Sequence, residues 1–152
     1  MAFPEPLGIH YRLVRRDDLT QTQRQAIEQW LPAAADHPRD PAATWWRFAQ
    51  LPGGYGMVDE HADVVALGHL GRISLPSDIH RIEPAWSVSG VFQRRGLGYA
   101  LAELLAEEAN HLGVQEIKEP RYDGAMSESA SRKIWGRFRG RFCLLKGAGL
   151  QP

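Results

Sequence analysis

The sequence predicts a single-domain α/β protein in which helices flank a mixed central β-sheet. Several short apolar or alternating runs, separated by Pro, Gly and Asp, are typical of strands. One of these runs leads directly into residues 94–112, which have a strongly amphipathic helical pattern. A chain of 152 residues fits one domain and can bury roughly two thirds of its unfolded surface. We therefore expect one domain over residues 1–152, with its core at about 9–146.

The first third of the chain is predicted to form one strand and two helices. Residues 9–15 alternate as a strand does. Asp17 and Asp18 are favourable N-caps for a helix that ends near Pro32. After a proline-rich loop, a second short helix is expected at about 41–48.

The middle of the chain is predicted to contribute three strands. They are expected at about 55–59, 64–75 and 80–91, with a turn between the first two. Pro84 interrupts the last run, which predicts a bulge or an edge there. The second run contains two glycines that are expected to form bulges. They are Gly68 and Gly71.

The C-terminal part begins with helix 94–112, the clearest predicted element. Gly113 is a favourable residue for ending it. A short strand at 114–119, a helix at 127–137 and a last strand at 141–146 are expected to follow. The apolar face of the first helix consists of Leu97, Leu101, Leu104, Leu105, Ala109 and Leu112.

Charge and composition exclude several classes of protein. Lys plus Arg and Asp plus Glu both number 18, so there is no excess of positive charge of the kind that nucleic-acid binders use. The single cysteine, Cys143, cannot form an internal disulfide, and its apolar surroundings predict a core position. Neither a signal peptide nor a membrane span is predicted, so we expect a soluble cytoplasmic protein without a metal.

The turn Gln93-x-x-Gly96-x-Gly98 joins the strand that ends near residue 91 to the amphipathic helix. Glycines allow a close approach of the backbone to a ligand, and the start of a helix presents free N–H groups and a positive dipole end. Such a site favours a phosphate. A dinucleotide fingerprint needs a third glycine where Leu101 stands, and a Walker loop needs Gly-Lys-Ser/Thr, which is missing.

The segment from Val88 to Gly98 resembles the acyl-CoA signature of the GCN5-related N-acetyltransferases, the GNAT superfamily. The valine, its spacing to Gln93 and both glycines match the pattern, and the element order resembles that family's mixed sheet. The resemblance implies an N-acyltransferase that uses acetyl-CoA or another acyl-CoA as co-substrate and a primary amine of a small molecule or peptide as acceptor. It implies main-chain contacts to the pantetheine arm from Trp86, Ser87 and Val88. It implies that the diphosphate is surrounded by Gln93, Arg94, Arg95, Gly96, Leu97, Gly98 and Tyr99.

An attacking amine must lose a proton, which requires a base or a water chain. Glu83 lies on the strand where the family often has a carboxylate, but one residue off the usual spacing, so it faces the right side only if a bulge at Pro84 restores the register. Glu119, at the end of the fifth strand, is the other candidate. His69 and His80 are weaker candidates, and a water relay without a single base stays open.

The segment 127–138 resembles the family's C-terminal helix, with two departures. Trp135 stands where a tyrosine that protonates the departing thiolate is expected, and an indole N–H donates hydrogen bonds but is not an acid. Serines replace an expected asparagine. Water, Tyr122 or a serine would then protonate the thiolate, or the chain binds acyl-CoA without turning it over, as a sensor or assembly module.

Two further features bear on the acceptor and on partners. Trp45 and Trp46 lie where the family often walls the acceptor site, although a core tryptophan with a surface neighbour explains the pair as well. A basic cluster near the C-terminus is a solvated face, a site for the cofactor's ribose phosphate, or a surface for aminoacylated RNA. Its members are Arg132, Lys133, Arg137, Arg139, Arg141 and Lys146. The oligomeric state, a homodimer included, stays open.

Overall fold

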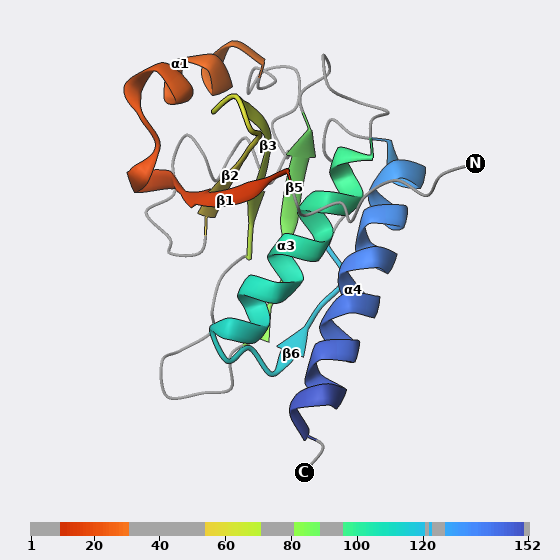
Figure 1. Ribbon diagram of the computed structural model, residues 1–152. Coiled ribbons are helices and arrows are strands. Elements are labelled where there is room, and N and C mark those ends of the chain that lie inside the picture. The colour runs from red at the N-terminus through yellow and green to blue at the C-terminus, as the bar shows by residue number, and fades with distance from the viewer. Residues whose placement is uncertain are drawn as a thin grey trace, which may run out of the picture.

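The computed structural model describes residues 10–30, 54–70, 81–88, 96–120, 122 and 127–150. Its main sheet has four antiparallel strands in the order β1-β2-β3-β5, and two helices, α3 and α4, lie side by side across it (Figure 1). A second, parallel pair joins β4 and β6. The strands are β1 (Arg12–Arg15), β2 (Gly54–Val58), β3 (Val64–His69), β4 (Arg81–Ile82), β5 (Ala85–Val88) and β6 (Glu116–Ile117). The helices are η1 (Arg16–Asp18), α1 (Gln21–Trp30), α3 (Leu97–His111) and α4 (Glu128–Leu150). The α/β class with helices flanking a central sheet is thus confirmed, with antiparallel pairing in the main sheet and parallel pairing in the second one.

The N-terminal helix starts later than the sequence predicts. Asp17 and Asp18 lie in the short 3-10 helix η1 and cap nothing. The cap of α1 is Thr20, whose Oγ1 accepts the N–H of Gln23 at 3.1 Å, while the Thr20 N–H donates to Gln23 Oε1 at 2.8 Å. Two residues three positions apart whose side chains accept each other's backbone N–H groups form a capping box. This pair of hydrogen bonds stabilises a helix start at Thr20 more than the single acidic cap that the sequence predicts at Asp17 or Asp18.

The hairpin of β2 and β3 is confirmed, but its irregularity is not where the glycines predict it. The pairing shifts between Met57 and Val58, whereas Gly68 pairs in register with Tyr55 and with Trp86. A Cβ on Gly68 would lie 2.7 Å from Leu105 Cδ1 of α3. Gly68 therefore permits close packing of the helix on the sheet and is not a bulge, and Gly71 lies outside the described residues.

The predicted fourth strand is two short strands that belong to different pairings. β4 pairs in parallel with β6, whereas β5 pairs antiparallel with β3. Pro84 lies between them, where the missing N–H ends one ladder. The Lys118 N–H donates to the Ile82 carbonyl at 2.8 Å, which extends the parallel pairing by one residue. Beyond that point the ladder does not continue, and no described residue of β6 pairs with β5.

Helix α3 matches its prediction closely. At its end, the Val114 N–H donates to Ala109 O at 3.0 Å and the Gly113 N–H donates to Asn110 O at 3.1 Å. Gly113 has φ +80°, so this is a Schellman ending, as its glycine predicts. Most of the predicted apolar face is buried against the sheet and α4, but Leu112 is 39% exposed.

The largest correction concerns α4, which runs unbroken from Glu128 to Leu150 where a strand was expected at 141–146. Ile134, Phe138 and Phe142 recur every four residues and are all buried, as on one face of a helix. Cys143 is exposed on the outer side, so its predicted core position is wrong.

Two buried clusters hold the fold together. The larger lies between the sheet and the pair α3 and α4 and includes Trp86, Leu101 and Phe138. The smaller contains Leu19 and Ile27 beside η1 and α1, packed on β2 and β3. Because both faces of β2 and β3 are covered, every residue of these strands is buried.

Candidate functional site

The start of α3 is uncapped. Its N-cap, Gly96, has φ +73° and no side chain to accept a hydrogen bond, and the first turn has no acidic residue. The carbonyl of Gly96 accepts from Tyr99 N–H and Ala100 N–H, both at 3.2 Å, while the N–H groups of Leu97 and Gly98 have no acceptor within the helix. The helix thus presents free donors and its positive dipole end, as the glycine turn predicts.

The starts of the other two α-helices in the described residues are already satisfied. The capping box at Thr20 closes α1, and Ser127 Oγ accepts the Ala130 N–H at 3.2 Å at the start of α4. Glu128 adds a negative charge to the first turn of α4. Among the α-helices of the described residues, α3 therefore has the start best suited to an anion.

Gly98 has a packing role that the sequence does not predict. A Cβ there would lie 2.8 Å from Ile134 Cδ1 and 2.9 Å from its Cγ1. The glycine is required for the close contact of α3 with α4. Gly96, with its positive φ, is the residue that shapes the turn.

The strand that precedes the turn is buried. Trp86, Ser87 and Val88 are between 4% and 7% exposed and pair with β3 on one side. On the other side the neighbouring strand, β6, follows β4 and then diverges from β5. The predicted pantetheine segment ends at the end of the sheet where α3 starts (Figure 1), the side on which ligands usually bind in such sheets.

The two candidate carboxylates lie on opposite faces of the sheet, near the point where β5 and β6 separate. Ile82, Trp86 and Val88 all pack in the cluster under α3 and α4, so the break at Pro84 does not change which positions face those helices. Glu83 is half-buried, and alternation directs it to the opposite face. Glu119 faces α4, where Arg132 Nη1 lies 3.5 Å from its Oε1.

Tyr122 completes a cluster around Glu119. Its hydroxyl donates a short hydrogen bond to Glu119 Oε1, and the guanidinium of Arg132 lies 4.6 Å from its ring centroid. Burial raises the pKa of Tyr122 above its ordinary value, and the hydrogen bond to the Glu119 carboxylate raises it further. Arg132 also contacts Glu128, Nε to Oε2 at 3.3 Å.

Trp135, where the resemblance predicts a tyrosine, packs against the core. Its ring stacks on Phe138 at a centroid distance of 5.9 Å and an interplanar angle of 24°. The ring of Phe138 also lies 6.4 Å from Trp86 and 6.3 Å from Phe142. His69 is buried at 8% exposure in β3, where it pairs in register with Gly54 and Ala85.

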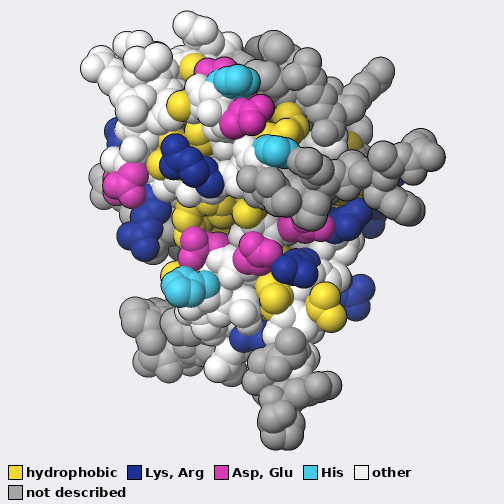
Figure 2. All heavy atoms as spheres, viewed as in Figure 1, with side chains coloured by type: hydrophobic (Ala, Val, Ile, Leu, Met, Phe, Trp, Pro, Cys, Tyr) yellow, Lys and Arg dark blue, Asp and Glu magenta, His cyan; other side chains and the backbone are white. Residues whose placement is uncertain are grey.

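Much of the basic cluster is neutralised by neighbouring acids. Arg137 Nη1 lies 3.3 Å from Glu103 Oε1, and Arg141 Nη2 lies 2.8 Å from Glu107 Oε1. Figure 2 shows these signs of charge side by side over the region of α3 and α4. The two acids are four positions apart in the sequence, and so are the two arginines, so the matching spacing is a signal from which these ion pairs could have been predicted. In the described residues Lys133 has neither an ion pair nor a hydrogen bond.

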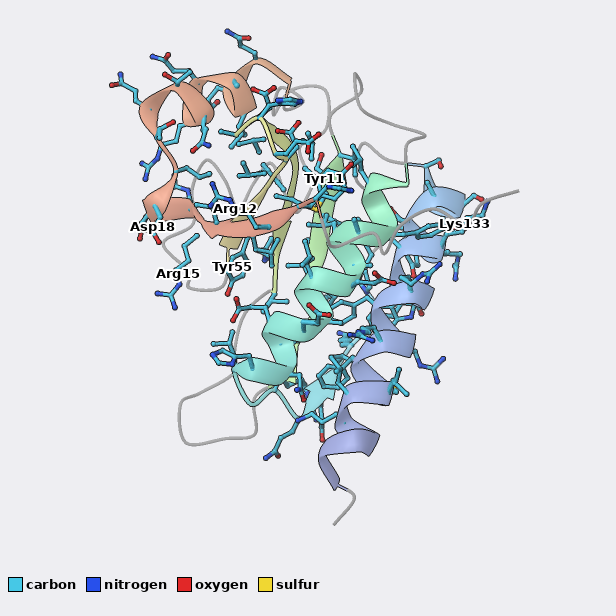
Figure 3. All side chains as sticks on the ribbon, in the orientation of Figure 1. Tyr11, Arg12, Arg15, Asp18, Tyr55 and Lys133 are labelled. Carbon is cyan, nitrogen blue, oxygen red and sulfur yellow. The ribbon has the colours of Figure 1, made fainter. Side chains whose placement is uncertain are left out.

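A groove of about 520 Å³ runs between α3 and α4. Cβ atoms on Gly136 and Gly140 would have no neighbour within 4 Å, so these glycines keep the groove open. Lys133 projects from the N-terminal part of α4, at the end of the molecule where α3 starts (Figure 3). The lining residues are Tyr99, Glu103, Lys133, Gly136, Arg137, Gly140, Arg141 and Leu144.

Several predicted site residues lie outside the described residues. They are Trp45, Trp46, His80, Gln93, Arg94 and Arg95. In the parts that are described, His, Cys, Asp and Glu side chains form no group of three that would hold a metal ion. Nor does any described helix have the length and apolar character needed to cross a membrane.

No protein-family model and no curated protein matches the sequence. Solved structures do match. A crystal structure of a proposed phosphinothricin N-acetyltransferase is 20% identical, with a TM-score of 0.56 over 84% of this chain and 78% of that one. An aminoglycoside acetyltransferase from an uncultured soil metagenomic sample, in complex with sisomicin, is 14% identical, with a TM-score of 0.45 over 90% of both chains. A GNAT family acetyltransferase of Staphylococcus aureus is 13% identical, with a TM-score of 0.45 over 79% of this chain and 94% of that one. The chain therefore has the fold of the GCN5-related N-acetyltransferases.

Proposed function

We propose that this protein is an acyl-CoA-dependent N-acyltransferase that transfers acetyl from acetyl-CoA to a primary amine. The observation that carries the proposal is the uncapped start of α3 at Gly96, beside the divergence of β5 and β6, in a GNAT fold. Backbone N–H groups at Leu97 and Gly98 would bind the pyrophosphate. Gln93, Arg94 and Arg95 belong to the same proposed site by resemblance.

The pantetheine arm would lie along Trp86, Ser87 and Val88, on the side of β5 with which no described strand pairs. An extended arm with amide groups suits the edge of a strand, because main-chain donors and acceptors point along it. The same direction brings the thioester toward the carboxylates at the divergence of the strands. Glu83 and Glu119 are the proposed bases, one on each face.

The adenosine end would lie in the groove between α3 and α4. Tyr99 offers an aromatic ring there, with Arg137 4.9 Å from its centroid. Lys133 is the cation of the groove that has no carboxylate partner among the described residues. A ribose 3′-phosphate is the anionic group of CoA that such a lysine would bind.

The acetyl transfer releases one proton overall. The acceptor enters as an ammonium ion and gives one proton to the base, which passes it to solvent. The neutral nitrogen forms a bond to the thioester carbonyl carbon, and the carbon–sulfur bond breaks. The second proton leaves the nitrogen and ends on the thiolate, so the products are an amide, CoA thiol and the released proton. Trp135 cannot supply the thiolate proton, so a water chain or another group has to carry it.

A second function is favoured by one observation. Trp135 stacks in the aromatic core at the position expected for an acid. A protein that holds acyl-CoA as a sensor or assembly module would need the phosphate site without that acid. Binding of acetyl-CoA without transfer to any amine would favour this alternative. An acceptor on aminoacylated RNA is disfavoured, because Arg132, Arg137 and Arg141 already have carboxylate partners.

The acceptor is proposed only by class. The structure named as a proposed phosphinothricin N-acetyltransferase makes small amines the first acceptors to test. Trp45 and Trp46 stay the proposed wall of the acceptor site. A panel of phosphinothricin, free amino acids, a polyamine and a lysine-containing peptide samples the small-molecule and peptide classes.

The decisive test is calorimetric titration with acetyl-CoA, free CoA and ATP, on wild type and two glycine variants. Gly96 and Gly113 have φ of +73° and +80° at opposite ends of the same helix. Alanine strains the backbone at either position by a similar amount, but only Gly96→Ala adds a methyl group to the proposed phosphate site. We expect acetyl-CoA to bind wild type and Gly113→Ala, and Gly96→Ala to bind much more weakly. If acetyl-CoA does not bind wild type, or binds both variants alike, the proposed site is wrong.

A further inference from the structure

We propose that Tyr122 and Arg132 are positioning residues that hold Glu119 as the base for the acceptor amine. They would fix its Oε1 and leave Oε2 to take the proton. This inference rests on the proposed function and decides between the two candidate carboxylates. The Glu119 carboxylate, rather than Glu83, is then the proton acceptor of the transfer written above.

Both contacts to Glu119 use the same oxygen. The hydroxyl of Tyr122 donates to Oε1, and Arg132 Nη1 lies 3.5 Å from Oε1. No described residue donates a hydrogen bond to Oε2. A carboxylate held by one oxygen has a defined orientation and still offers a free oxygen, which is the arrangement a base needs.

Arg132 is itself held from two sides. Its guanidinium lies over the Tyr122 ring, and its Nε lies 3.3 Å from Glu128 Oε2. The charged and titratable groups around Glu119 are therefore Tyr122, three residues after it in the sequence, and Arg132 and Glu128 from α4. Two parts of the chain thus meet at one carboxylate that is otherwise about half exposed, with 47% of its side chain accessible.

The location of Glu119 fits a role where the two pairings separate. Glu119 directly follows Lys118, whose N–H makes the last hydrogen bond to Ile82, and Pro84 separates β4 from β5 on the facing segment. Glu83 lies one residue earlier and faces away from α4. In the described residues Glu83 has neither a hydrogen bond nor an ion pair, so nothing there orients it.

The raised pKa of Tyr122 favours a role in positioning Glu119 over a role as the acid that protonates the thiolate. A phenol next to an ionised carboxylate gives up its proton reluctantly, and its raised pKa keeps Tyr122 protonated over the range where amines are acetylated. Tyr122 is thus a constant donor to Glu119 and a poor source of a proton for the thiolate.

The first experiment tests the pair without any need for activity. Tyrosinate absorbance is followed as pH rises in wild type, Glu119→Gln and Glu116→Gln, and Tyr122→Phe identifies the signal of Tyr122. Glu116 is the matched control, since it lies on β6 three residues before Glu119, pairs with Arg81 at 2.7 Å and is 46% exposed. We expect Tyr122 to ionise at lower pH in Glu119→Gln only. An unchanged titration would mean that the hydrogen bond does not form, and would overturn the proposal.

The second experiment is a double-mutant cycle on acetyl transfer to the panel amine that wild type acetylates fastest. We expect Tyr122→Phe to lower kcat about tenfold with an unchanged KM for acetyl-CoA, because the base is misplaced. Glu119→Gln should lower kcat about a hundredfold. Tyr122→Phe should add nothing in the Glu119→Gln background. Arg132→Lys should retain more of kcat than Arg132→Gln, and Tyr11→Phe is the control for the loss of a phenol elsewhere.

An equal loss from Tyr122→Phe in both backgrounds would overturn the positioning role, since Tyr122 would then act on its own. An unaltered kcat in Glu119→Gln would do the same and would leave Glu83 or water as the base. If wild type binds no acetyl-CoA, the proposed function fails, and the catalytic role of Glu119 fails with it. The absorbance titration still reports whether the pair exists, so the two failures are distinguishable.

Discussion

The side chain of Ile134 on α4 occupies the space that a side chain on Gly98 of α3 would need. Its Cδ1 and Cγ1 lie 2.8 Å and 2.9 Å from the position of a Cβ at that glycine, closer than real Cβ atoms come. The contact lies at the proposed phosphate site, in the first turn of α3. The second glycine of the turn thus fixes the distance between the two helices that form the groove.

Inserting a methyl group into a packed site usually costs about 1–3 kcal/mol, and the higher helix propensity of Ala offsets about 1 kcal/mol of this. Gly98→Ala should therefore destabilise the protein by up to about 2 kcal/mol. Urea unfolding measures the change. Gly140→Ala is the matched control, because a Cβ there has no neighbour within 4 Å, and it should be neutral or slightly stabilising. If Gly98→Ala is as stable as Gly140→Ala, the close contact is absent.

The helical course of α4 through residues 141–146 gives a second prediction. In a strand, Phe142 and Leu144 would lie on the same face, whereas in the helix Phe142 is 4% exposed and Leu144 is 63% exposed. Phe142→Ala should cost about 3 kcal/mol or more in the free energy of unfolding. Leu144→Ala should change it by less than about 0.5 kcal/mol. Similar large losses at both positions would indicate the strand that the sequence predicts.

Both ends of α3 could be predicted because their signals are local. The glycines at 96 and 113 need positive φ, and they mark the two ends without knowledge of any partner. The error at α4 has a non-local cause. A strand-like run between glycines becomes helix because Ile134, Phe138 and Phe142 pack on α3 and the core, a contact that no local pattern contains.

The candidate site likewise has one part that local sequence predicts and another that depends on contacts distant in sequence. The phosphate turn is a continuous segment, so its residues could be named from the sequence. The partners of Glu119 could not, because Arg132 lies 13 positions away in sequence and reaches it only after α4 has docked. Lys133 is the cation of the groove that has no carboxylate partner in the described part of the chain, since Glu103 and Glu107 engage Arg137 and Arg141.

The stability of the protein should fall at high pH through Tyr55. Burial, with the charge of Glu108 as a smaller contribution, raises the pKa of Tyr55 from its ordinary 10.0 to about 12. Between these values the unfolded state releases the phenolic proton and the folded state keeps it, so unfolding is favoured as pH rises. The contribution is fully present below pH ~10 and is lost by pH ~12, for a total of about 3 kcal/mol. Urea unfolding of wild type and Tyr55→Phe at several pH values checks this, and an equally steep decline in Tyr55→Phe would contradict it.

Lys133 should distinguish CoA from 3′-dephospho-CoA. It lines the groove between α3 and α4, and its ammonium group has no carboxylate partner in the described residues, whereas Arg137 and Arg141 do. A partly exposed ion pair contributes up to about 1 kcal/mol, so Lys133→Gln should weaken CoA binding by roughly two- to fivefold. Binding of 3′-dephospho-CoA should be unchanged, and the difference should shrink as salt is added.

Lys133→Arg should keep the preference for CoA, since it keeps the charge. Arg139→Gln is the matched control, because Arg139 is exposed on α4 and does not line the groove. Calorimetric titration of the four proteins with both ligands gives the comparison. An equal loss for both ligands in Lys133→Gln would mean that the lysine contacts a part they share, such as the diphosphate. No loss of affinity for either ligand would mean that the adenosine end lies elsewhere. The proposed phosphate site at Gly96 is tested separately, by the titration of the two glycine variants.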